Sequence, residues 1–340
     1  MNAKLNIGVI GVGHLGSLHS KMYAEIETAH FVGVYDVSEE KRKEIAAKFK
    51  VKAFAAIEEM LPNVDAVSIA TVTTTHFEVA KKIINAGKHV LIEKPITTTL
   101  QEADELIALA KEKNVLIQVG HIERFNPAIV SLETYKLAPM FIESHRLAQF
   151  NPRGTDVAVV LDLMIHDIDI ILSLVNSPVK QIDANGVAVV SDTPDIANAR
   201  LQFENGCVAN VTSSRISRTK MRKMRMFQNN AYIAIDFQNG SADVFRLGNE
   251  GEGSIWSTML LGQIGEGKKK RNIIYEQPEI KKINALKYEL ESFVHAVQTN
   301  SRPVVSGEDG RLALDVAQWR VHRTKCDRPG CHRVVEAGIG

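Results

Sequence analysis

Short apolar runs alternate with helical patterns along the first third of the chain. We predict strands at the apolar runs, which are Leu5–Ile10, Phe31–Tyr35, Asp65–Ile69, Lys88–Ile92 and Val115–Val119. The stretches between them repeat apolar residues at helical spacing and cover residues 14–26, 38–49, 74–86 and 99–113. Strands that alternate with helices form βαβ units, so residues 1–122 are predicted to be an α/β domain with a doubly wound parallel sheet.

The pattern changes at about residue 123. One long apolar helix is predicted at residues 157–175, strands follow at 179–190, 197–204, 207–215, 221–228 and 231–237, and two helices follow at 283–299 and 307–320. Short turns such as Glu204-Asn205-Gly206 separate neighbouring strands, which is typical of antiparallel hairpins. Residues 123–320 are therefore predicted to form an α+β domain with a large, mostly antiparallel open sheet. The uncovered face of that sheet is a candidate surface for self-association.

Two stretches are predicted to be irregular. Residues 248–271 contain six glycines and end in a basic run, which is typical of a mobile surface loop. Residues 321–340 form a tail in which Pro329 and Gly330 end any helix. Cys326, Cys331 and the histidines near them fit no common zinc spacing, so we predict no metal site.

A glycine-rich motif, Gly11-Val12-Gly13-His14-Leu15-Gly16, follows the first strand directly and opens a helix. Gly11 would make the tight turn, Gly13 would let a pyrophosphate approach the backbone, and Gly16 would let the helix pack closely on the strand. The N–H groups at the start of the helix, around His14 and Leu15, would bind the phosphates. The alternative is that the glycines only shape a turn.

Asp36 ends the second strand, 20 residues after Gly16. A carboxylate at this place accepts hydrogen bonds from an adenosine ribose and repels a 2′-phosphate. Val37 and Ser38 place no arginine immediately beside it. The predicted cofactor is therefore NAD, in preference to NADP.

Further cofactor contacts are expected at Thr71, Thr73 and His76, which leave the next strand on the same sheet edge. Small hydroxyl residues suit contact with ribose and phosphate. The alternative is a helix N-cap at Thr73 or Thr74, and the two roles are compatible. Glu93 and Gln118 complete the set of expected cofactor contacts.

Lys94 stands where a buried strand stops, because Pro95 cannot continue the hydrogen-bonded ladder. The carboxyl ends of parallel strands are the edge at which ligands bind. An ammonium group is costly to hold there without a partner or a task. Lys94 is therefore a candidate for both cofactor and substrate contact and for catalysis.

The predicted helix at 157–175 carries a narrow polar stripe. At 100° per residue, Asp162, His166, Asp169 and Ser173 share one side, whereas Asp167 lies elsewhere. A solvent-facing stripe is the alternative, but such faces usually carry Lys, Glu, Arg and Gln, which are absent here. Short acids and one histidine suit a ligand crevice better.

These residue types suggest the oxidation of an alcohol. Removing a hydride from a secondary alcohol requires a base for the hydroxyl proton, and a histidine oriented by a carboxylate can serve. Asp162 precedes His166 by one helical turn. Lys94 could polarise the hydroxyl or relay its proton.

Three motifs in this order resemble the Gfo/Idh/MocA oxidoreductases: Gly11–Gly16 with Asp36, Glu93-Lys94-Pro95, and the segment from Asp162 to Asp169. Members are two-domain NAD(P)-dependent enzymes that act mostly on sugars, inositols and related alcohols. The resemblance covers residues 4–320. It implies a Rossmann domain, a second domain whose open sheet commonly mediates dimers or tetramers, and catalytic roles for Lys94, Asp162 and His166.

A narrower resemblance involves the segment from Gly120 to Pro127, with Ser214–Ser217 and Lys220–Lys223. It is similar to the branch containing UDP-N-acetylglucosamine 3-dehydrogenases, which turn the 3-hydroxyl into a ketone for lipid A synthesis. A nucleotide-sugar diphosphate requires arginine or lysine partners. The expected substrate contacts are Lys94, His121, Arg124, Asn126, Arg153, Asp162 and His166. Arg215 and Arg218 are further candidates, but a solvated strand face explains the basic run 215–225 as well.

Composition excludes several classes of protein. Of the 340 residues, 41 are Lys or Arg and 40 are Asp or Glu, a net charge of +1, which argues against nucleic-acid binding. No apolar run approaches the roughly 20 residues of a membrane span. Three cysteines cannot form a disulfide framework. Because Met1 to Lys4 lead straight into a strand, we expect no secretory signal and a cytoplasmic protein.

The predicted function is NAD-dependent oxidation of a secondary alcohol on a sugar, with the 3-hydroxyl of a UDP-N-acetyl amino sugar as the specific candidate. One alternative is a dehydrogenase of a free sugar, a sugar phosphate or an inositol. Another is a non-catalytic NAD-binding sensor on the same fold, which the presence of Lys94 and His166 disfavours.

Overall fold

The computed structural model describes residues 4–151, 157–248, 258–265 and 270–318. These residues form two compact units. Among the described residues, unit 1 comprises those from 4 to 125 and from 283 to 315, and unit 2 comprises those from 126 to 282 and from 316 to 318.

Unit 1 is built on six parallel strands in the order β3-β2-β1-β4-β5-β6. The strands are β1 (Leu5–Ile10), β2 (Ala29–Tyr35), β3 (Lys52–Ala53), β4 (Ala66–Ile69), β5 (His89–Glu93) and β6 (Ile117–Gly120). The helices are α1 (His14–Tyr23), α2 (Glu39–Phe49), α3 (Ile57–Met60), α4 (His76–Asn85), α5 (Leu100–Lys113), α8 (Ala285–Thr299) and α9 (Gly307–Ala317), with 3₁₀ turns η1 (Leu61–Asn63), η2 (Thr73–Thr75) and η3 (Ile122–Phe125). The predicted doubly wound parallel sheet is confirmed.

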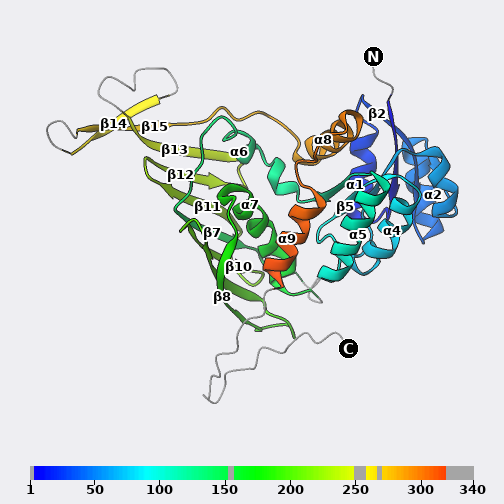
Figure 1. The fold of residues 1–340 in the computed structure, drawn as a ribbon, viewed down its shortest axis with the longest axis horizontal. Coiled ribbons are helices and arrows are strands. Elements are labelled where there is room, and N and C mark those ends of the chain that lie inside the picture. The colour runs from blue at the N-terminus through cyan, green and yellow to red at the C-terminus, as the bar shows by residue number, and fades with distance from the viewer. Residues whose placement is uncertain (1–3, 152–156, 249–257, 266–269, 319–340) are drawn as a thin grey trace. The chain divides into compact units, whose positions relative to one another are not determined.

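Helices cover both faces of this sheet. Residues on alternate sides of its strands, such as Ile7, Val67, Val90 and Leu91, are fully buried. Helix α1 packs with α2 and α8, whereas α4 packs with α5 (Figure 1). Burial on both faces explains why these strands appear in the sequence as continuous apolar runs.

Two helices of unit 1 begin with side-chain caps. The Ser38 side chain accepts the Lys41 N–H at the start of α2. At the start of α5, Thr99 and Glu102 form a complete capping box, in which each side chain accepts an N–H of the other's backbone.

Helices α8 and α9 were expected in the second domain, but most of their residues group with unit 1. Leu290, Phe293 and Val294 of α8 belong to the hydrophobic cluster that also contains β1 and β2 residues. Arg311 of α9 donates from Nε to Asp104 Oδ1 of α5 at 2.9 Å. The division therefore differs from the expected boundaries for residues 283–315, because the chain returns to unit 1 after completing the second sheet.

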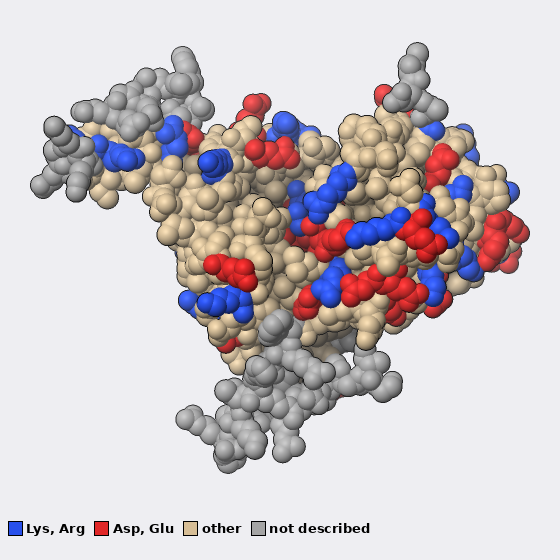
Figure 2. Space-filling view, in the orientation of Figure 1, with Lys and Arg blue, Asp and Glu red and all other residues tan. Residues whose placement is uncertain are grey.

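Opposite charges alternate on the surface of unit 1 over α4, α5 and α9 (Figure 2). Lys81 pairs with Glu105 at 2.7 Å, and Lys111 pairs with Glu308 at 3.0 Å. Exposed pairs of this kind contribute little to stability, about 0–1 kcal/mol each. In this view the two signs are interspersed, unlike the continuous basic stripe typical of nucleic-acid-binding proteins.

Unit 2 is built on a nine-stranded sheet in the order β14-β15-β13-β12-β11-β7-β10-β9-β8 (Figure 1). The strands are β7 (Phe141–Leu147), β8 (Val179–Val187), β9 (Ile196–Phe203), β10 (Val208–Ser214), β11 (Met221–Gln228), β12 (Ala231–Asp236), β13 (Ser241–Gly248), β14 (Thr258–Ile264) and β15 (Arg271–Glu276). Only the β7–β10 pair among these described strands is parallel. The predicted mostly antiparallel sheet is confirmed.

One expectation for this sheet was wrong. Residues 248–271 were expected to be a loop, but residues 258–264 form strand β14, which pairs with β15. The segment Met259–Ile264 is largely apolar, but the glycines around it favoured the prediction of a loop. Residues 249–257 and 266–269 lie outside the described residues.

The helix predicted at 157–175 has two parts. Residues Val160–Met164 form a π-helical turn, η4, and α7 (Ile165–Val175) continues from it. The short helix α6 (Pro127–Val130) precedes the sheet. None of the described helices is long and apolar enough to cross a membrane.

A buried ion pair fixes α7 to the sheet. Arg146 of β7 donates from Nε and Nη2 to the two carboxylate oxygens of Asp167 at 3.0 and 2.9 Å. Both side chains are almost fully buried, and the Arg146 guanidinium also lies 5.9 Å from the Phe237 ring centroid. Asp167 therefore faces the sheet, away from the polar stripe, as its position in the sequence predicted.

Removing one member of this pair should be costly. We expect Arg146→Met to lower the free energy of unfolding by about 3–5 kcal/mol, because it leaves the Asp167 charge buried and uncompensated. The double variant Arg146→Met/Asp167→Leu should recover most of that loss. The control is Arg225→Met, which breaks a half-exposed pair with Glu143 on the other face and should cost about 1 kcal/mol or less. Urea unfolding measures all three, and equal losses in the two single variants would contradict this assignment.

Candidate functional site

Five strand ends of unit 1 lie in one row. Pairing joins Tyr35 to Ile10, Ile10 to Ile69, Ile69 to Ile92 and Ile92 to Val119. The next residue of each strand lies at the carboxyl edge of the sheet, and these residues are Asp36, Gly11, Ala70, Glu93 and Gly120. Glu93 and Gly120 still pair with each other as the last residues of β5 and β6. Open α/β sheets bind ligands at this edge, where the winding reverses between β1 and β4.

The glycine loop after β1 has the geometry of a phosphate site. Gly11 has φ +82°, which favours glycine, and a Cβ at Gly16 would lie 1.7 Å from the Gly11 carbonyl oxygen. A Cβ at Gly13, in contrast, would meet no protein atom within 4 Å. The fold itself therefore leaves room for a side chain at Gly13, and a ligand approaching the backbone explains the glycine.

The N-terminus of α1 has the features of an anion-binding helix end. Its N-cap, Gly13, supplies no side-chain acceptor, and its first turn contains no acidic residue. His14 and Leu15 are exposed there. The first N–H groups of the helix are thus available to a phosphate, together with the positive end of the helix dipole.

Asp36 lies beside this loop. Its Oδ2 accepts the Val12 N–H and its Oδ1 accepts the Ser38 N–H, both at 2.8 Å. Each oxygen can accept a second hydrogen bond, so the carboxylate remains able to bind a ribose hydroxyl.

Arg42 was missed by the sequence analysis. Its Nη1 donates to the Asp36 carbonyl oxygen at 3.3 Å, from one turn into α2. Arg42 is not adjacent to Asp36 in the sequence, but the first turn of α2 brings it back to the strand end. Asp36 therefore has a guanidinium next to it.

The loop after β4 contributes threonines and a buried histidine. Thr71 and Thr73 are half-buried, and Thr71 Oγ1 accepts from Thr75 Oγ1 at 2.8 Å. His76 is buried, with Nδ1 2.9 Å from the Pro95 carbonyl oxygen and Nε2 3.2 Å from that of Thr71. Burial lowers the pKa of His76, although the carbonyl contacts oppose this. The His76 ring therefore connects the loop after β4 to the loop after β5, and both its nitrogens contact backbone carbonyl groups.

At the end of β5, Lys94 is half-buried and Glu93 is buried. Glu93 Oε2 accepts the Lys94 N–H at 3.3 Å, and its Oε1 lies 2.9 Å from Nε2 of His19 on α1. Burial opposes ionisation of Glu93, but His19 and Lys94 outweigh it and hold the Glu93 pKa below its ordinary value. The end of this strand thus carries a carboxylate followed by the lysine.

Three other expected residues of this region are tied into the fold. Gln118 is buried and donates its amide to the Glu289 carbonyl oxygen of α8 at 3.1 Å, and His121 is buried after β6. Asn126 caps α6 by accepting the Ala128 N–H, and it donates to the Phe237 carbonyl oxygen at 3.1 Å. Arg124 is half-buried in η3.

In unit 2, the polar stripe differs from the helical projection. Asp162 lies in the π-turn and His166 in the first turn of α7, so 100° per residue does not describe the step between them. Both are half-buried, Asp169 is buried, and Ser173 is exposed. His166, Asp169 and Ser173 keep the spacing of the predicted stripe within α7, whereas the π-turn changes the helical phase at Asp162. Inserted π-turns are frequent at functional sites.

The basic run 215–225 consists of one buried arginine and a solvated strand face. Arg215 is buried, lies 3.5 Å from the Asp195 carboxylate, and donates to the Val157 and Pro194 carbonyl oxygens. Burial opposes ionisation of Asp195, yet the N–H groups of residues 189–191 and the Ser191 hydroxyl lower its pKa to about 2. Arg215 is therefore part of the protein's own framework.

Farther along the run, the charged side chains of β11 pair on the open face of the sheet. Lys223 contacts Asp236 at 3.3 Å and Arg225 contacts Glu143 at 2.7 Å. Arg218 is exposed. Arg153 and the tail cysteines Cys326 and Cys331 lie outside the described residues. Among the residues that are described, no group of three or more His, Cys, Asp or Glu could hold a metal ion.

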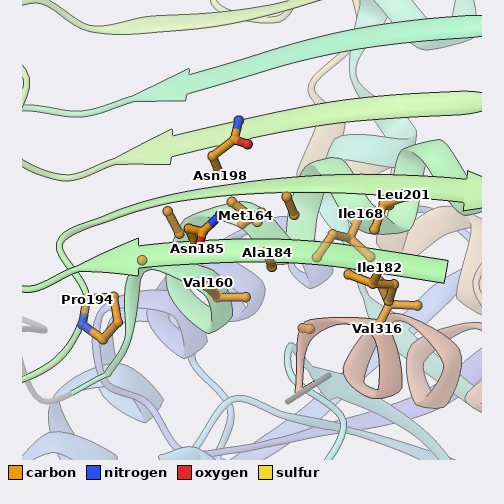
Figure 3. A pocket seen from close by; sticks show the side chains of 14 residues that line it. Val160, Met164, Ile168, Ile182, Ala184, Asn185, Pro194, Asn198, Leu201 and Val316 are labelled. Atoms are coloured by element: carbon orange, nitrogen blue, oxygen red, sulfur yellow. The ribbon is translucent and has the colours of Figure 1, made fainter. Parts of the chain in front are cut away.

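An apolar pocket lies within unit 2, between η4 and α7 on one side and β8 and β9 on the other (Figure 3). It contains about 520 Å³ of space, part of it open to solvent. Val160, Met164 and Ile182 point into it, and its polar residues are Asn185 and Asn198. It carries no titratable side chain, so it does not supply acid–base chemistry.

Two family models match the chain. Residues 5–121 match the oxidoreductase family with an NAD-binding Rossmann fold, and residues 136–241 match the GFO/IDH/MocA C-terminal domain. The chain belongs to the Gfo/Idh/MocA oxidoreductase family.

Individual members of this family align over nearly the whole chain. UDP-N-acetylglucosamine 3-dehydrogenase of Acidithiobacillus ferrooxidans is 38% identical over 314 residues, which cover 92% of this chain and 95% of that protein. Its solved structure has a TM-score of 0.82 at 37% identity and covers 93% of this chain and 96% of that one. Myo-inositol 2-dehydrogenase of Thermotoga maritima is 26% identical, covering 91% of this chain and 93% of that protein.

Membership in the Gfo/Idh/MocA family confirms several predictions. The family, the α/β fold class with its two sheets, and the NAD-binding Rossmann domain agree with the sequence analysis. The protein is a nicotinamide-dependent dehydrogenase of CH–OH groups. The glycine loop, the uncapped α1 N-terminus and Asp36 fit a dinucleotide.

Substitution by alanine should have different effects at Gly13 and at Gly16. We expect Gly13→Ala to keep the wild-type melting temperature but to weaken NADH binding at least about tenfold, because only a ligand competes for its Cβ position. Gly16→Ala should lower the melting temperature, because its Cβ overlaps the Gly11 carbonyl. Thermal unfolding and NADH fluorescence titration measure the two effects. Wild-type NADH affinity in Gly13→Ala would contradict the phosphate-site assignment.

Proposed function

We propose that the protein oxidises a secondary alcohol of a nucleotide sugar, the 3-hydroxyl of a UDP-N-acetyl amino sugar, with NAD as hydride acceptor. The observation that carries this proposal is the row of strand ends in unit 1, which aligns Lys94 with the glycine loop and Asp36. The substrate follows from the relative that is 38% identical over 92% of the chain.

The row of strand ends extends across four neighbouring strands. From Asp36 at the end of β2 to Glu93 at the end of β5 there are three strand spacings, about 14 Å at about 4.8 Å each. We propose that Asp36 binds the adenosine ribose and the α1 N-terminus binds the pyrophosphate. Thr71 and Thr73 would contact the nicotinamide half, whose ring would then lie near Lys94.

The chemistry needs one base and one polarising group. NAD, when bound, supplies the acceptor for the hydride from the carbinol carbon. We propose that His166 takes the hydroxyl proton and that Asp162 orients His166 or the substrate. Lys94 donates from Nζ to the substrate oxygen and stabilises the negative charge that develops there.

Asp36 and Arg42 act in opposite directions on cofactor choice. A 2′-phosphate would be repelled by the Asp36 carboxylate but attracted by the Arg42 guanidinium. We propose that NAD is preferred, because the carboxylate lies at the strand end itself, whereas Arg42 is engaged by the Asp36 carbonyl and lies 3.8 Å from Glu39. The ratio of kcat/KM for NAD and NADP measures the preference.

Substrate choice is tested by NADH formation with a panel of alcohols: UDP-N-acetylglucosamine, free sugars, sugar phosphates and inositols. We expect the highest kcat/KM with UDP-N-acetylglucosamine and NAD. A higher value with an inositol would favour the activity of the Thermotoga maritima relative instead. Bound NADH without turnover of any alcohol would support a non-catalytic sensor and contradict the proposal.

The roles of the side chains are tested with Lys94→Met and His166→Ala. Each should lower kcat by about 100-fold or more while NADH still binds, because general acid–base groups contribute about 10²–10⁴-fold. Lys88→Met, at the opposite end of β5, is the matched control and should leave kcat unchanged. Turnover at the wild-type rate in either test variant would remove its assigned role.

We also infer that the protein forms a homodimer or homotetramer through the open face of the nine-stranded sheet. Aromatic side chains cross this face on five strands, and they are Phe141, Phe227, Tyr232, Phe245 and Tyr275, with neighbouring ring centroids 5.0–6.0 Å apart. The Arg146 side of β7 packs on α7, so the aromatic ladder faces away from that helix. Phe227 is 38% exposed. An apolar ladder of this extent is typical of a protein–protein interface.

Substitution within the aromatic ladder tests this assembly. Tyr232→Glu places a charge at its centre and should dissociate the oligomer into monomers in sedimentation experiments. Asp183→Lys, an exposed change on the distant strand β8, is the control and should leave the assembly intact. A wild-type protein that sediments as a monomer would contradict the inference.

A further inference from the structure

A fully buried histidine lies behind the proposed lysine site. His19 projects from the second turn of α1 and has no exposed surface. Its Nδ1 lies 2.8 Å from Ser68 Oγ on β4, and its Nε2 lies 2.9 Å from Glu93 Oε1 on β5. A buried polar ring is costly to the fold unless it is fully hydrogen-bonded, and both nitrogens of this one are satisfied.

The contacts define the direction of each hydrogen bond. Because the Glu93 pKa is held below its ordinary value, its carboxylate oxygen Oε1 accepts a hydrogen bond from the N–H at His19 Nε2. With a neutral ring, Nδ1 then accepts the Ser68 hydroxyl. The second Glu93 oxygen accepts the backbone N–H of Lys94. A continuous path of hydrogen bonds thus runs from β4 through His19 and Glu93 to Lys94.

The Glu93 carboxylate has little freedom within this path. Gly120 on β6 pairs with Glu93, and a Cβ at Gly120 would lie 3.0 Å from both Cδ and Oε2 of Glu93. The carboxylate therefore occupies space that any other residue at 120 would compete for. On the other side of Lys94, His76 contacts the Pro95 carbonyl.

We propose that His19 is a positioning residue for Lys94: it holds the Glu93 carboxylate in the orientation that fixes the Lys94 backbone, and so sets where the ammonium group meets the substrate. This inference rests on the proposed catalytic role of Lys94. A buried polar pair is weak support for stability alone, since well-packed apolar residues of similar volume often serve as well. The pair connects the helix of the glycine loop to the strand of the lysine, where a displacement of about 1 Å can reduce the rate about 100-fold.

Three variants separate positioning from folding. His19→Leu keeps the volume and removes the donor, His19→Gln keeps an N–H that can reach Glu93, and His89→Leu makes the same change at the other end of β5. His89 accepts the Leu116 N–H through Nδ1 and lies four residues, about 13 Å, from Glu93. Any loss that follows only from weakening the sheet should therefore appear in His89→Leu as well.

Kinetics with NAD and the best alcohol of the panel give the first readout. We expect His19→Leu to lower kcat by about 10- to 100-fold with unchanged NADH affinity. His19→Gln should have about tenfold higher kcat than His19→Leu, and His89→Leu should keep the wild-type kcat. A wild-type kcat in His19→Leu, or equal losses in His19→Leu and His89→Leu, would overturn the inference.

Crystal structures of the wild type and of His19→Leu with NADH give a second readout that needs no substrate. We expect the Lys94 Cα to move by more than about 0.5 Å in the variant, the tolerance of a preorganised site. An unmoved Lys94 would overturn the inference even where Lys94→Met has proved that the lysine is catalytic. A moved Lys94 in a protein that turns over no alcohol would instead support the positioning and contradict only the proposed function.

Discussion

The parallel pairing of β2, β1, β4, β5 and β6 at their carboxyl ends is the constraint on which the site of unit 1 depends. Because Tyr35, Ile10, Ile69, Ile92 and Val119 pair in sequence across the sheet, the residue after each of them lies at the same edge of the sheet. A slip of one residue in any pair would move a functional side chain to the opposite face. Apolar burial on both faces of the strands fixes that register, so the core of unit 1 also positions its chemistry.

The positions of Asp36, the glycine loop and Lys94 could be predicted because each follows a buried apolar strand directly. Such strands are recognisable from short runs of branched residues, and parallel packing makes their ends coincide. Strand β7 could not be predicted in the same way. Its inward face carries Ser144 and Arg146, and Arg146 is stable there only through Asp167, which lies on a helix 21 residues away.

Other features depend on contacts that a residue pattern does not encode. The π-turn at Val160–Met164 is a shift in backbone hydrogen bonding, and it altered the phase assumed between Asp162 and His166. Arg42 reaches the end of β2 only because α2 turns back toward it. No motif in the sequence singled out His19, because its partner Glu93 lies 74 residues away. These are residues whose roles emerge only when distant segments meet.

The central claim is that the carboxyl edge of the parallel sheet binds the dinucleotide with its nicotinamide toward Lys94. A crystal structure of the wild-type protein with NADH tests it most directly. The account predicts the pyrophosphate over the N–H groups of Gly13 to Leu15, the adenosine ribose on Asp36, and the nicotinamide ring at the end of β5 beside the Lys94 ammonium. A dinucleotide bound in the reverse direction, or with its nicotinamide ring away from Lys94, would contradict it.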